Sequence, residues 1–355
     1  MTEAARWELL VKRDDLAVTE TRAAEAAPLG AGEVELAFER IGLTMNNVTY
    51  ARWGGVAPMN FWDAFPSPDP AWGRLPVWGF ARVTRSNHPG YPAGDRFFGY
   101  LPSSSHHVVR PEPASRGFRD TTPGRHFAHP WYQTFQPAGA ADHRDDRRTL
   151  LRPVYPAAFH VADFVTGKAG DGEVTVVITS ASSKVGIGIA HRLRGHANVR
   201  TIGLTAAGHS AFLAGLAVYD EVTTYDALPA AAGGPVVCVD IAGDADVLTA
   251  LHTAFRPHLG HLVLLGWTHG GSTPPELTDP EPEMFFTPAV EDEAIAAEGE
   301  DAFFARYHAA EDEYIDFTES WLAVATGRGP EAIATVFRHL VDGTHAADSS
   351  TVITP

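Results

Sequence analysis

Apolar residues in the second half of the chain gather in short continuous runs, which small or polar residues separate. Strands are expected over residues 174–178, 198–205, 221–225, 235–241 and 261–266. Runs of this length suit strands buried on both faces, and the intervening residues 210–217 and 247–255 have the spacing of helices. Strands alternating with helices predict a parallel doubly wound sheet, which binds ligands beyond the carboxyl ends of its strands.

In the first half of the chain, apolar and polar residues alternate instead. Val34, Leu36 and Phe38 fall on one face of a strand over residues 33–41. Further short strands follow, with Gly and Pro between them, a pattern typical of a small β-barrel. Residues 112–148 are rich in Pro, Arg, His and Asp and are expected to form a long loop or insertion.

Helical spacing returns where the two halves join and near the end of the chain. A helix over residues 150–165 is expected to lead into the first apolar run. Residues 284–287 are a candidate sixth strand of the parallel sheet. A helix-rich segment over 301–326 and a helix over 330–341 then precede a last strand at 351–353.

Composition narrows the function classes. The formal net charge of -17 disfavours nucleic acid and anionic membranes, because the surface would repel phosphates. No apolar run reaches the roughly 18 residues of a membrane span, and the N-terminus lacks the pattern of a signal peptide, so we expect a cytoplasmic protein. Cys238 is the single cysteine, which excludes disulfides within the chain and a cysteine-rich zinc site. The acidic stretch 279–316 is interpreted as solvated surface.

Between the first apolar run and the next helix lies a turn of small residues, Thr179 to Gly186. A strand, a small-residue turn and a helix start together bind pyrophosphate, because backbone N–H groups and the positive helix end face the anion. Only Gly186 and Gly188 remain of the usual glycine pattern. Lys184 opposes the helix dipole unless an anion is bound nearby. The alternative interpretation of this segment is an ordinary strand–helix joint.

Three segments, in this order, are similar to signatures of the medium-chain dehydrogenase/reductase superfamily. Ile41-Gly-Leu-Thr-Met-Asn-Asn-Val-Thr-Tyr50 resembles the family's Gly-[Leu/Ile]-Asn-x-x-Asp segment at the nicotinamide site. Gly90-Tyr-Pro-Ala-Gly-Asp-Arg-Phe97 resembles its Gly-x-x-x-Gly-Asp-Arg-Val signature, and residues 181–186 stand where the family has Ala-Ala-Gly-Gly-Val-Gly. Because the zinc-dependent branch needs cysteine ligands, the chain resembles the zinc-independent quinone and enoyl reductases, as a diverged side branch.

The resemblance implies an α/β fold with two domains and a returning tail. Residues 1–148 would form a GroES-like β-barrel domain carrying the insertion 112–148. Residues 149–327 would form the Rossmann-type nucleotide-binding domain, and residues 328–355 would return to the barrel domain. The implied activity is NADPH-dependent reduction of an enone or enoyl double bond of a small molecule, in an interdomain cleft. Two alternatives stay open: carbonyl reduction, and a nucleotide-binding relative without redox turnover.

The same resemblance implies the site residues. Tyr50 would supply a proton to the substrate beside Asn47, although a half-buried aromatic on a barrel strand is an equal interpretation of Tyr50. NADPH is favoured over NADH because no acid follows Leu204 at the end of the second strand. The residues expected to contact the cofactor are Asn46, Ser182, Ser183, Lys184, Val185, Gly186, Thr205, His209, Tyr225, Gly266, Trp267 and Thr268.

No metal site is expected, since His126 and His129 lack acidic or cysteine partners nearby in the sequence. Tyr155 and His160 are more readily explained by core packing than by catalysis, and Cys238 by the core. Asp240 is a candidate cap of the turn that follows its strand. The expected partner is a small-molecule substrate, with no nucleic acid or membrane, and self-association into a homodimer is left open.

Overall fold

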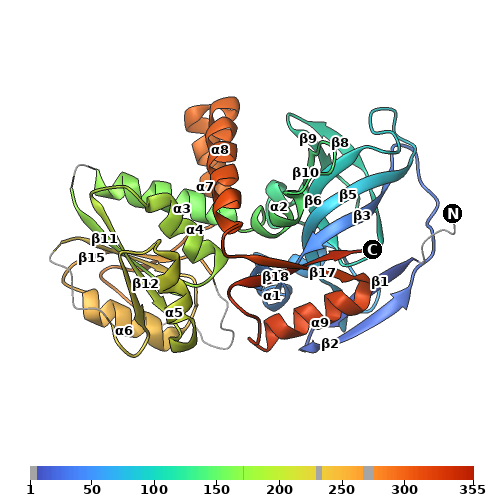
Figure 1. The fold of residues 1–355 in the computed structure, drawn as a ribbon. Coiled ribbons are helices and arrows are strands. Elements are labelled where there is room, and N and C mark those ends of the chain that lie inside the picture. Colours follow the sequence, from blue (N-terminus) through green and yellow to red (C-terminus); the bar gives the residue numbers. More distant parts are fainter. Residues whose placement is uncertain (1–5, 171, 229–233, 267–275) are drawn as a thin grey trace. The chain divides into compact units, whose positions relative to one another are not determined.

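The computed structural model describes residues 6–170, 172–228, 234–266 and 276–355. The chain forms two compact units: the first comprises Met1–Pro153 and Ala323–Pro355, and the second comprises Val154–Leu322. The described strands of the first unit form two mostly antiparallel sheets, and those of the second form a parallel sheet (Figure 1). The predicted fold class is therefore confirmed.

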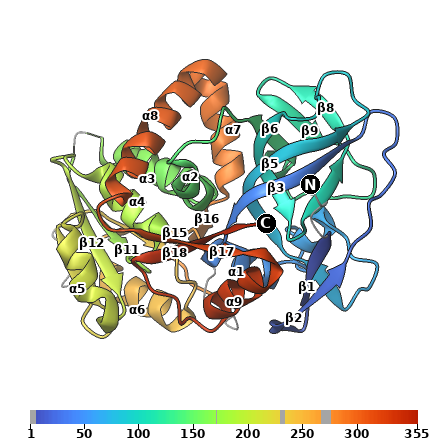
Figure 2. The same ribbon diagram turned by 45° about the vertical axis from the view of Figure 1, so that its right-hand side comes forward.

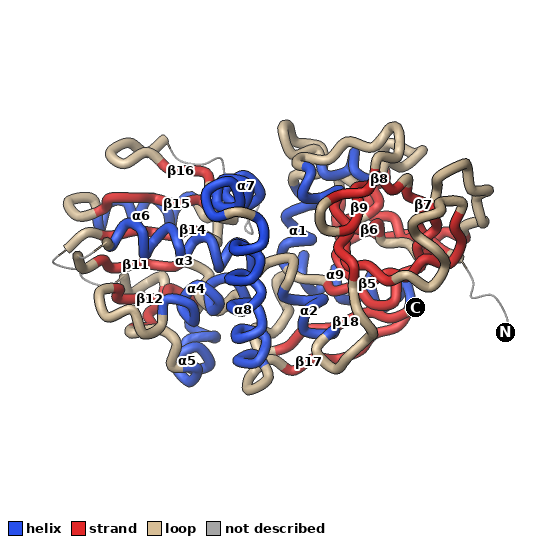
Figure 3. Tube along the Cα trace, turned by 90° about the horizontal axis from the view of Figure 1, so that it is seen from above, coloured by secondary structure: helices blue, strands red, loops and turns tan. Residues whose placement is uncertain are grey.

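The first unit contains two sheets, with strand orders β17-β18-β3-β5-β6-β10-β9-β8 and β2-β1-β4, and β7 pairs with β3. Viewed from above, β5, β6, β8 and β9 curl around a common centre (Figure 3). The helices and strands of this unit are β1 (Trp7–Lys12), β2 (Asp15–Ala23), β3 (Val34–Gly42), α1 (Met45–Arg52), η1 (Phe61–Ala64), β4 (Trp72–Arg74), β5 (Pro76–Ser86), β6 (Arg96–Pro102), β7 (His106–Val109), β8 (Pro111–Ala114), β9 (Gly117–Asp120), η2 (Pro130–Gln133), β10 (Thr134–Pro137), α2 (Asp145–Leu151), β17 (Ala323–Arg328), α9 (Gly329–Val341) and β18 (Ser349–Thr354).

The core of the first unit follows the alternation seen in the sequence. Val34, Leu36 and Phe38 of β3 are buried in one apolar cluster. The tail of the chain completes this cluster, because Ile333 and Phe337 of α9 pack into it. Strand β18 pairs with β3, and β17 pairs with β18, so the tail extends the barrel sheet (Figure 2).

The segment 112–148 differs from the expected long loop. It contains most of β8, all of β9 and β10, and the short helix η2, and β10 pairs with both β6 and β9. Each of the three strands has four residues, and prolines occur in β8 and β10. Strands this short have little period-two pattern for sequence analysis to detect, and proline within a run disfavours the prediction of a strand.

The second unit is a parallel sheet of strand order β13-β12-β11-β14-β15-β16. Helices α3, α4 and α8 lie on one face of this sheet and α6 on the other (Figures 1 and 3). Cys238 is fully buried in the cluster beneath α6, as expected. The elements are α3 (Tyr155–Ala169), β11 (Val174–Ile178), α4 (Lys184–Leu193), β12 (Val199–Thr205), α5 (Ala207–Leu216), β13 (Glu221–Thr224), β14 (Val236–Asp240), α6 (Ala245–Phe255), β15 (Leu259–Leu264), β16 (Pro282–Met284), α7 (Thr287–Glu298) and α8 (Glu300–Thr318).

Two expected helix boundaries differ from the structure. The single helix expected over 150–165 is two helices, α2 and α3, because Pro153 interrupts the backbone hydrogen bonds between them. The helix-rich segment expected to reach residue 326 ends with α8 at Thr318, and β17 follows. The residues of β17 are partly or fully exposed, so this strand is defined by its pairing with β18 and not by burial.

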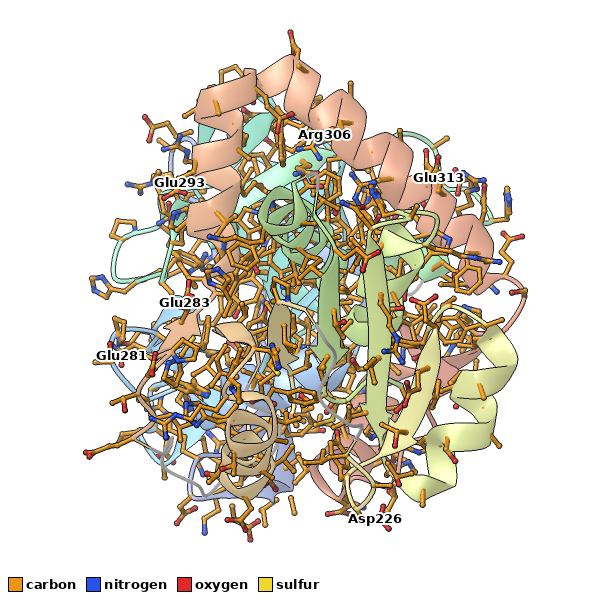
Figure 4. All side chains as sticks on the ribbon, turned by 90° about the vertical axis from the view of Figure 1, so that its left-hand side faces the viewer. Asp226, Glu281, Glu283, Glu293, Arg306 and Glu313 are labelled. Atoms are coloured by element: carbon orange, nitrogen blue, oxygen red, sulfur yellow. The ribbon has the colours of Figure 1, made fainter. Side chains whose placement is uncertain are left out.

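Helices α7 and α8 carry most of the acidic stretch. Glu283, Glu293 and Glu313 are exposed and lie at the periphery of the second unit (Figure 4). Arg306 of α8 instead forms an ion pair with Asp163 of α3, and its guanidinium lies 4.5 Å from the centre of the Phe159 ring. These contacts dock α8 on the helical layer of the sheet. No helix in the described part of the chain has both the length and the apolar character needed to cross a membrane.

Candidate phosphate site and the residues of helix α1

The loop between β11 and α4 lies at the point where the strand order of the parallel sheet reverses. Chain order runs outward from β11 through β12 to β13 on one side, and through β14, β15 and β16 on the other. Loops after the two central strands of such a sheet flank a crevice in which ligands bind. The loop of residues 179–183 therefore occupies the position expected for a ligand site.

Most backbone N–H groups of this loop already have acceptors. Ser180 donates to the Tyr225 hydroxyl (2.8 Å), Ala181 to the Leu204 carbonyl (3.0 Å), Ser183 to the Ser180 carbonyl (2.8 Å) and Gly186 to the Ser183 hydroxyl (3.0 Å). Within the described residues, three N–H groups at the loop and the start of α4 have no acceptor. They belong to Ser182, Lys184 and Val185. An anion at this position would satisfy them.

The start of α4 depends on a cap and on a close backbone approach. Ser183 is the N-cap, and its hydroxyl accepts the bond from the N–H of Gly186. A Cβ atom at Gly186 would lie 3.0 Å from backbone atoms of Ser180 and Ala181. Backbone atoms cannot swing aside, so only glycine fits here without displacing the loop. Gly186 thus keeps the structural role that the family pattern assigns to it.

Lys184 stands at the first position of α4 without a counter-charge. Its side chain is half-buried, and the described residues provide no carboxylate within ion-pair distance of its Nζ atom. Burial lowers the pKa of Lys184 to about 8, since the charged ammonium loses hydration. The positive helix end adds to this cost. A bound anion would remove both penalties.

Three predicted cofactor residues meet beside the loop. The Thr205 hydroxyl, at the end of β12, donates to Ser182 Oγ (3.1 Å), and His209 Nδ1 lies 3.2 Å from the same oxygen. No acidic side chain stands among them, because Ala206 and Ala207 follow Thr205. This edge can therefore accept a phosphate as readily as a ribose hydroxyl.

The loop is tied to the next strand by a buried pair. Thr179 donates its hydroxyl proton to Asp240 Oδ1 (2.6 Å), and the other Asp240 oxygen accepts from the N–H of Gly243 (3.0 Å). Asp240 is fully buried, and burial raises its pKa. It caps the turn after β14, as the sequence analysis suggested.

On the other side of the crevice, Gly266 lies beyond β15. Its N–H reaches the Asp240 carbonyl at 3.3 Å, and a Cβ here would lie 2.7 Å from the Ile241 carbonyl oxygen. The other two candidates of this segment, Trp267 and Thr268, lie outside the described residues.

The remaining candidates lie in the first unit, on helix α1. Tyr50 is on this helix, so its interpretation as an aromatic on a barrel strand is wrong. Its hydroxyl accepts from Asn46 Nδ2 (2.7 Å) and Trp78 Nε1 (3.0 Å), and it is also hydrogen-bonded to the Tyr132 side chain. Burial raises the pKa of Tyr50, and these bonds only partly offset the effect, so the phenol is protonated at neutral pH.

The side chain of Asn47 forms hydrogen bonds at the start of α1 and to β5. Its Oδ1 atom accepts from the N–H of Thr44 (2.7 Å), as in a capping box, and its Nδ2 atom donates to the Pro76 carbonyl (2.9 Å). Asn47 therefore fixes the start of α1 and ties it to β5. Asn47 thereby holds the helix that carries Tyr50. The amide oxygen and the amide nitrogen of Asn47 are both used in these hydrogen bonds.

Other polar candidates have local structural partners. His129 accepts from the N–H of Trp131 at the start of η2 (3.2 Å). Tyr155 donates to the Ala310 carbonyl (2.9 Å), and the buried His160 ring stacks on Phe303. Across the ranges that the structure describes, no group of three or more His, Cys, Asp or Glu side chains is placed to hold a metal ion.

Two tyrosines absent from the sequence analysis contact the candidate phosphate loop, defined as residues 179–185. The Tyr219 hydroxyl donates to the Ala181 carbonyl (3.1 Å), and the Tyr314 hydroxyl donates to the Lys184 carbonyl (2.6 Å). Neither lies in a motif. The one signal for Tyr219 in the sequence is Gly203 inside β12, where a Cβ would lie 3.0 Å from the ring. A Cβ at Gly188 in α4 would approach Ala158 at 2.9 Å and lie only in ordinary contact with Tyr314, so Gly188 is no signal for that ring.

One protein family matches most of the chain. The family described as "Protein of unknown function (DUF2855)" matches residues 41–346. The chain belongs to this family. Curated protein sequences give no match. The DUF2855 match spans both units, from the end of β3 to the residues just before β18.

Solved structures show which fold the DUF2855 chain has. CurA from Vibrio vulnificus, solved in complex with NADPH, is 13% identical with a TM-score of 0.63, and 98% of each chain is covered. The yhdH oxidoreductase from Salmonella enterica, solved in complex with NADP, is 13% identical with a TM-score of 0.59, over 98% of this chain and 99% of that chain. A putative NADPH:quinone reductase from Bacillus thuringiensis is 13% identical with a TM-score of 0.60, over 99% of this chain and 100% of that chain. The resemblance to the zinc-independent reductases is thus confirmed at the level of fold.

Proposed function

We propose that this protein is a zinc-independent, NADPH-dependent oxidoreductase that reduces an activated carbon–carbon double bond of a small molecule. One observation carries the proposal. The three N–H groups of Ser182, Lys184 and Val185 have no acceptor among the described residues, and the uncompensated Lys184 ammonium stands beside them. Similar folds solved with NADPH or NADP support a dinucleotide as the anion.

The residues of the second unit suit NADPH. The pyrophosphate would accept from the free N–H groups at the start of α4, with Gly186 allowing the backbone of Ser180 and Ala181 to pack against this helix start. Thr205, Ser182 and His209 would hold the phosphate on the adenosine ribose, where no acid repels it. Tyr225 and Gly266 would border the same crevice, and Trp267 and Thr268 belong to the proposal on sequence grounds alone.

When bound, NADPH supplies a hydride to the carbon β to the carbonyl. The electrons of the double bond then reside on the carbonyl oxygen as an enolate, and one proton must be added. We assign that proton to Tyr50 or to water. The Asn46 and Trp78 donors would stabilise the phenolate left on Tyr50.

Two other functions remain as alternatives. Carbonyl reduction would use the same groups, with the hydride delivered to the carbonyl carbon and the proton to its oxygen. The Ser-Ser-Lys loop, which departs from the glycine-rich pattern, favours a nucleotide-binding protein without redox turnover as the second alternative. Rates are measured with a short α,β-unsaturated ketone, an aldehyde and a quinone. Reduction of the ketone at its double bond supports the proposal, reduction of the aldehyde supports the first alternative, and turnover of none of the three supports the second.

NADPH should bind at least about tenfold more tightly than NADH, a difference of about 1.4 kcal/mol. The reason is the absence of an acid after β12. Titration of nicotinamide fluorescence measures both affinities. The matched variant is Ala206→Asp, because Ala206 is exposed at the N-cap of α5, where aspartate is well tolerated. This variant should lose the preference for NADPH. Equal affinities in the unaltered protein would remove the argument, and binding of neither would favour a different ligand.

Replacing Lys184 with alanine should weaken NADPH binding by about 10- to 100-fold, because a charge-assisted hydrogen bond contributes about 1.5–3 kcal/mol. The lysine is protonated only below a pKa of about 8. NADPH affinity of the unaltered protein should therefore fall as the pH rises through this value, and the variant should lack that part of the dependence.

The unliganded Lys184→Ala protein should be as stable as the unaltered protein or slightly more stable. The folded-state pKa of Lys184 is lowered, so its charged form costs stability below about pH 8, and removing the lysine removes that cost. Lys168→Ala is the control, since Lys168 is an exposed lysine of the same unit, in the last turn of α3. A variant of Lys184 that lost stability but kept its affinity for NADPH would show a structural residue.

A further inference from the structure

Two peptide groups of the phosphate loop are bonded on their carbonyl side by tyrosines. The Ala181 carbonyl accepts from Tyr219, and the N–H of the same peptide group belongs to Ser182. The Lys184 carbonyl accepts from Tyr314, and the N–H of that peptide group belongs to Val185. Two of the three N–H groups that lack an acceptor among the described residues thus share a peptide plane with a tyrosine-bonded carbonyl.

Both tyrosine side chains are buried and closely packed. Tyr314 of α8 is fully buried, stacks on Tyr155 with ring centres 5.0 Å apart, and lies beside Gly188, where a Cβ would be in ordinary contact with the ring at 3.4 Å. Tyr219 is also buried, and a Cβ at Gly203 would lie 3.0 Å from its ring. The two rings come from distant parts of the sequence and approach the loop from separate elements.

Both phenols act as proton donors in these bonds, because a carbonyl oxygen can only accept. Burial raises the pKa of Tyr219 and of Tyr314 well above the usual range, so both stay protonated throughout the range in which the protein would work. Ser180, at the other end of the loop, donates its N–H to Tyr225 instead. Tyr225 therefore holds the loop without acting on the two peptide groups in question.

A hydrogen bond to a carbonyl polarises the whole peptide group and makes its N–H a stronger donor. It also fixes the orientation of the peptide plane. We propose that Tyr219 and Tyr314 are positioning residues, which orient and polarise the peptide groups whose Ser182 and Val185 N–H groups bind the cofactor pyrophosphate. This inference rests on the proposed function. It also gives α8, otherwise an acidic surface helix, a part in the phosphate site.

The experiment removes only the hydroxyl groups, in Tyr219→Phe and Tyr314→Phe. Each variant should weaken NADPH and NADH by the same factor, about 3- to 10-fold for a neutral hydrogen bond, with the ratio between the two cofactors unchanged. The control is Tyr155→Phe, because Tyr155 is equally buried and also donates to a backbone carbonyl, that of Ala310 in α8. This control should lose a similar amount of stability and keep its affinity for both cofactors.

A second measurement needs no cofactor. In the unliganded variants, the amide proton resonances of Ser182 (in Tyr219→Phe) and Val185 (in Tyr314→Phe) should move to lower frequency, since a less polarised N–H is more shielded. Unchanged amide shifts, unchanged affinities, or an affinity loss equal to that of Tyr155→Phe would each overturn the inference. If the unaltered protein bound neither cofactor, the proposed function would fail, whereas the amide shifts would still decide whether the phenols act on the peptides.

Discussion

Replacing Tyr50 with phenylalanine should lower kcat for reduction of a short α,β-unsaturated ketone by about 100-fold or more, the usual contribution of a positioned proton donor. The ring stays, so its packing against Phe61 and Tyr100 is kept. Because the Tyr50 hydroxyl is proposed to donate a proton to the substrate and not to bind the cofactor, the Kd for NADPH should not change. Steady-state rates and fluorescence titration measure the two quantities separately.

Tyr100→Phe is the matched control for Tyr50→Phe. Tyr100 is a buried phenol of the same aromatic cluster, and its hydroxyl has no hydrogen-bond partner in the described part of the chain. Losing that hydroxyl should leave kcat unchanged. If Tyr50→Phe reduced kcat by less than about tenfold, water would be the proton source, and Tyr50 would serve only to pack the cluster.

The parallel sheet could be predicted from the sequence because each of its inner strands is buried on both faces. All residues of β11 and β14 are buried, and four of the five residues in each strand are apolar. Edge strands and very short strands do not have this property. The residues of β17 are at best half-buried, and β10 has four residues including Pro137, so pairing within the folded sheet determines both.

The phosphate loop was predictable for a related reason, since its strand, turn and helix are consecutive in the chain. Ser183 as a helix cap and Lys184 at a helix start follow from local sequence. The contacts of Tyr219 and Tyr314 do not, because 130 residues separate Tyr314 from Lys184. For Tyr50 the segment could be identified by its resemblance to the family signature, but its conformation was not predicted. The segment is helical, and the Asn47 capping box stabilises the start of that helix.

Replacing Asp145 with alanine should destabilise the first unit by about 3 kcal/mol, the lower part of the range for breaking a buried ion pair. Arg96, from the Gly-Asp-Arg segment, donates to Asp145 Oδ2 at 2.7 Å, and the side chains of both residues are almost fully buried. Without Asp145 the guanidinium would keep Glu39 and the Gly139 carbonyl as partners. These remaining partners place the expected loss at the lower part of the range.

The neighbouring carboxylate provides a control in the same helical turn. Asp146 also lies in the first turn of α2, so Asp146→Ala removes the same favourable interaction with the helix dipole. Its ion pair with Arg40 has a similarly short distance (2.6 Å) but is more exposed, so this variant should lose less than about 1 kcal/mol. Urea unfolding followed by tryptophan fluorescence reports mainly on the first unit, because only Trp267 and Trp321 lie in the second. Equal losses in the two variants would mean that the dipole, and not the buried Arg96–Asp145 pair, holds α2 against the barrel.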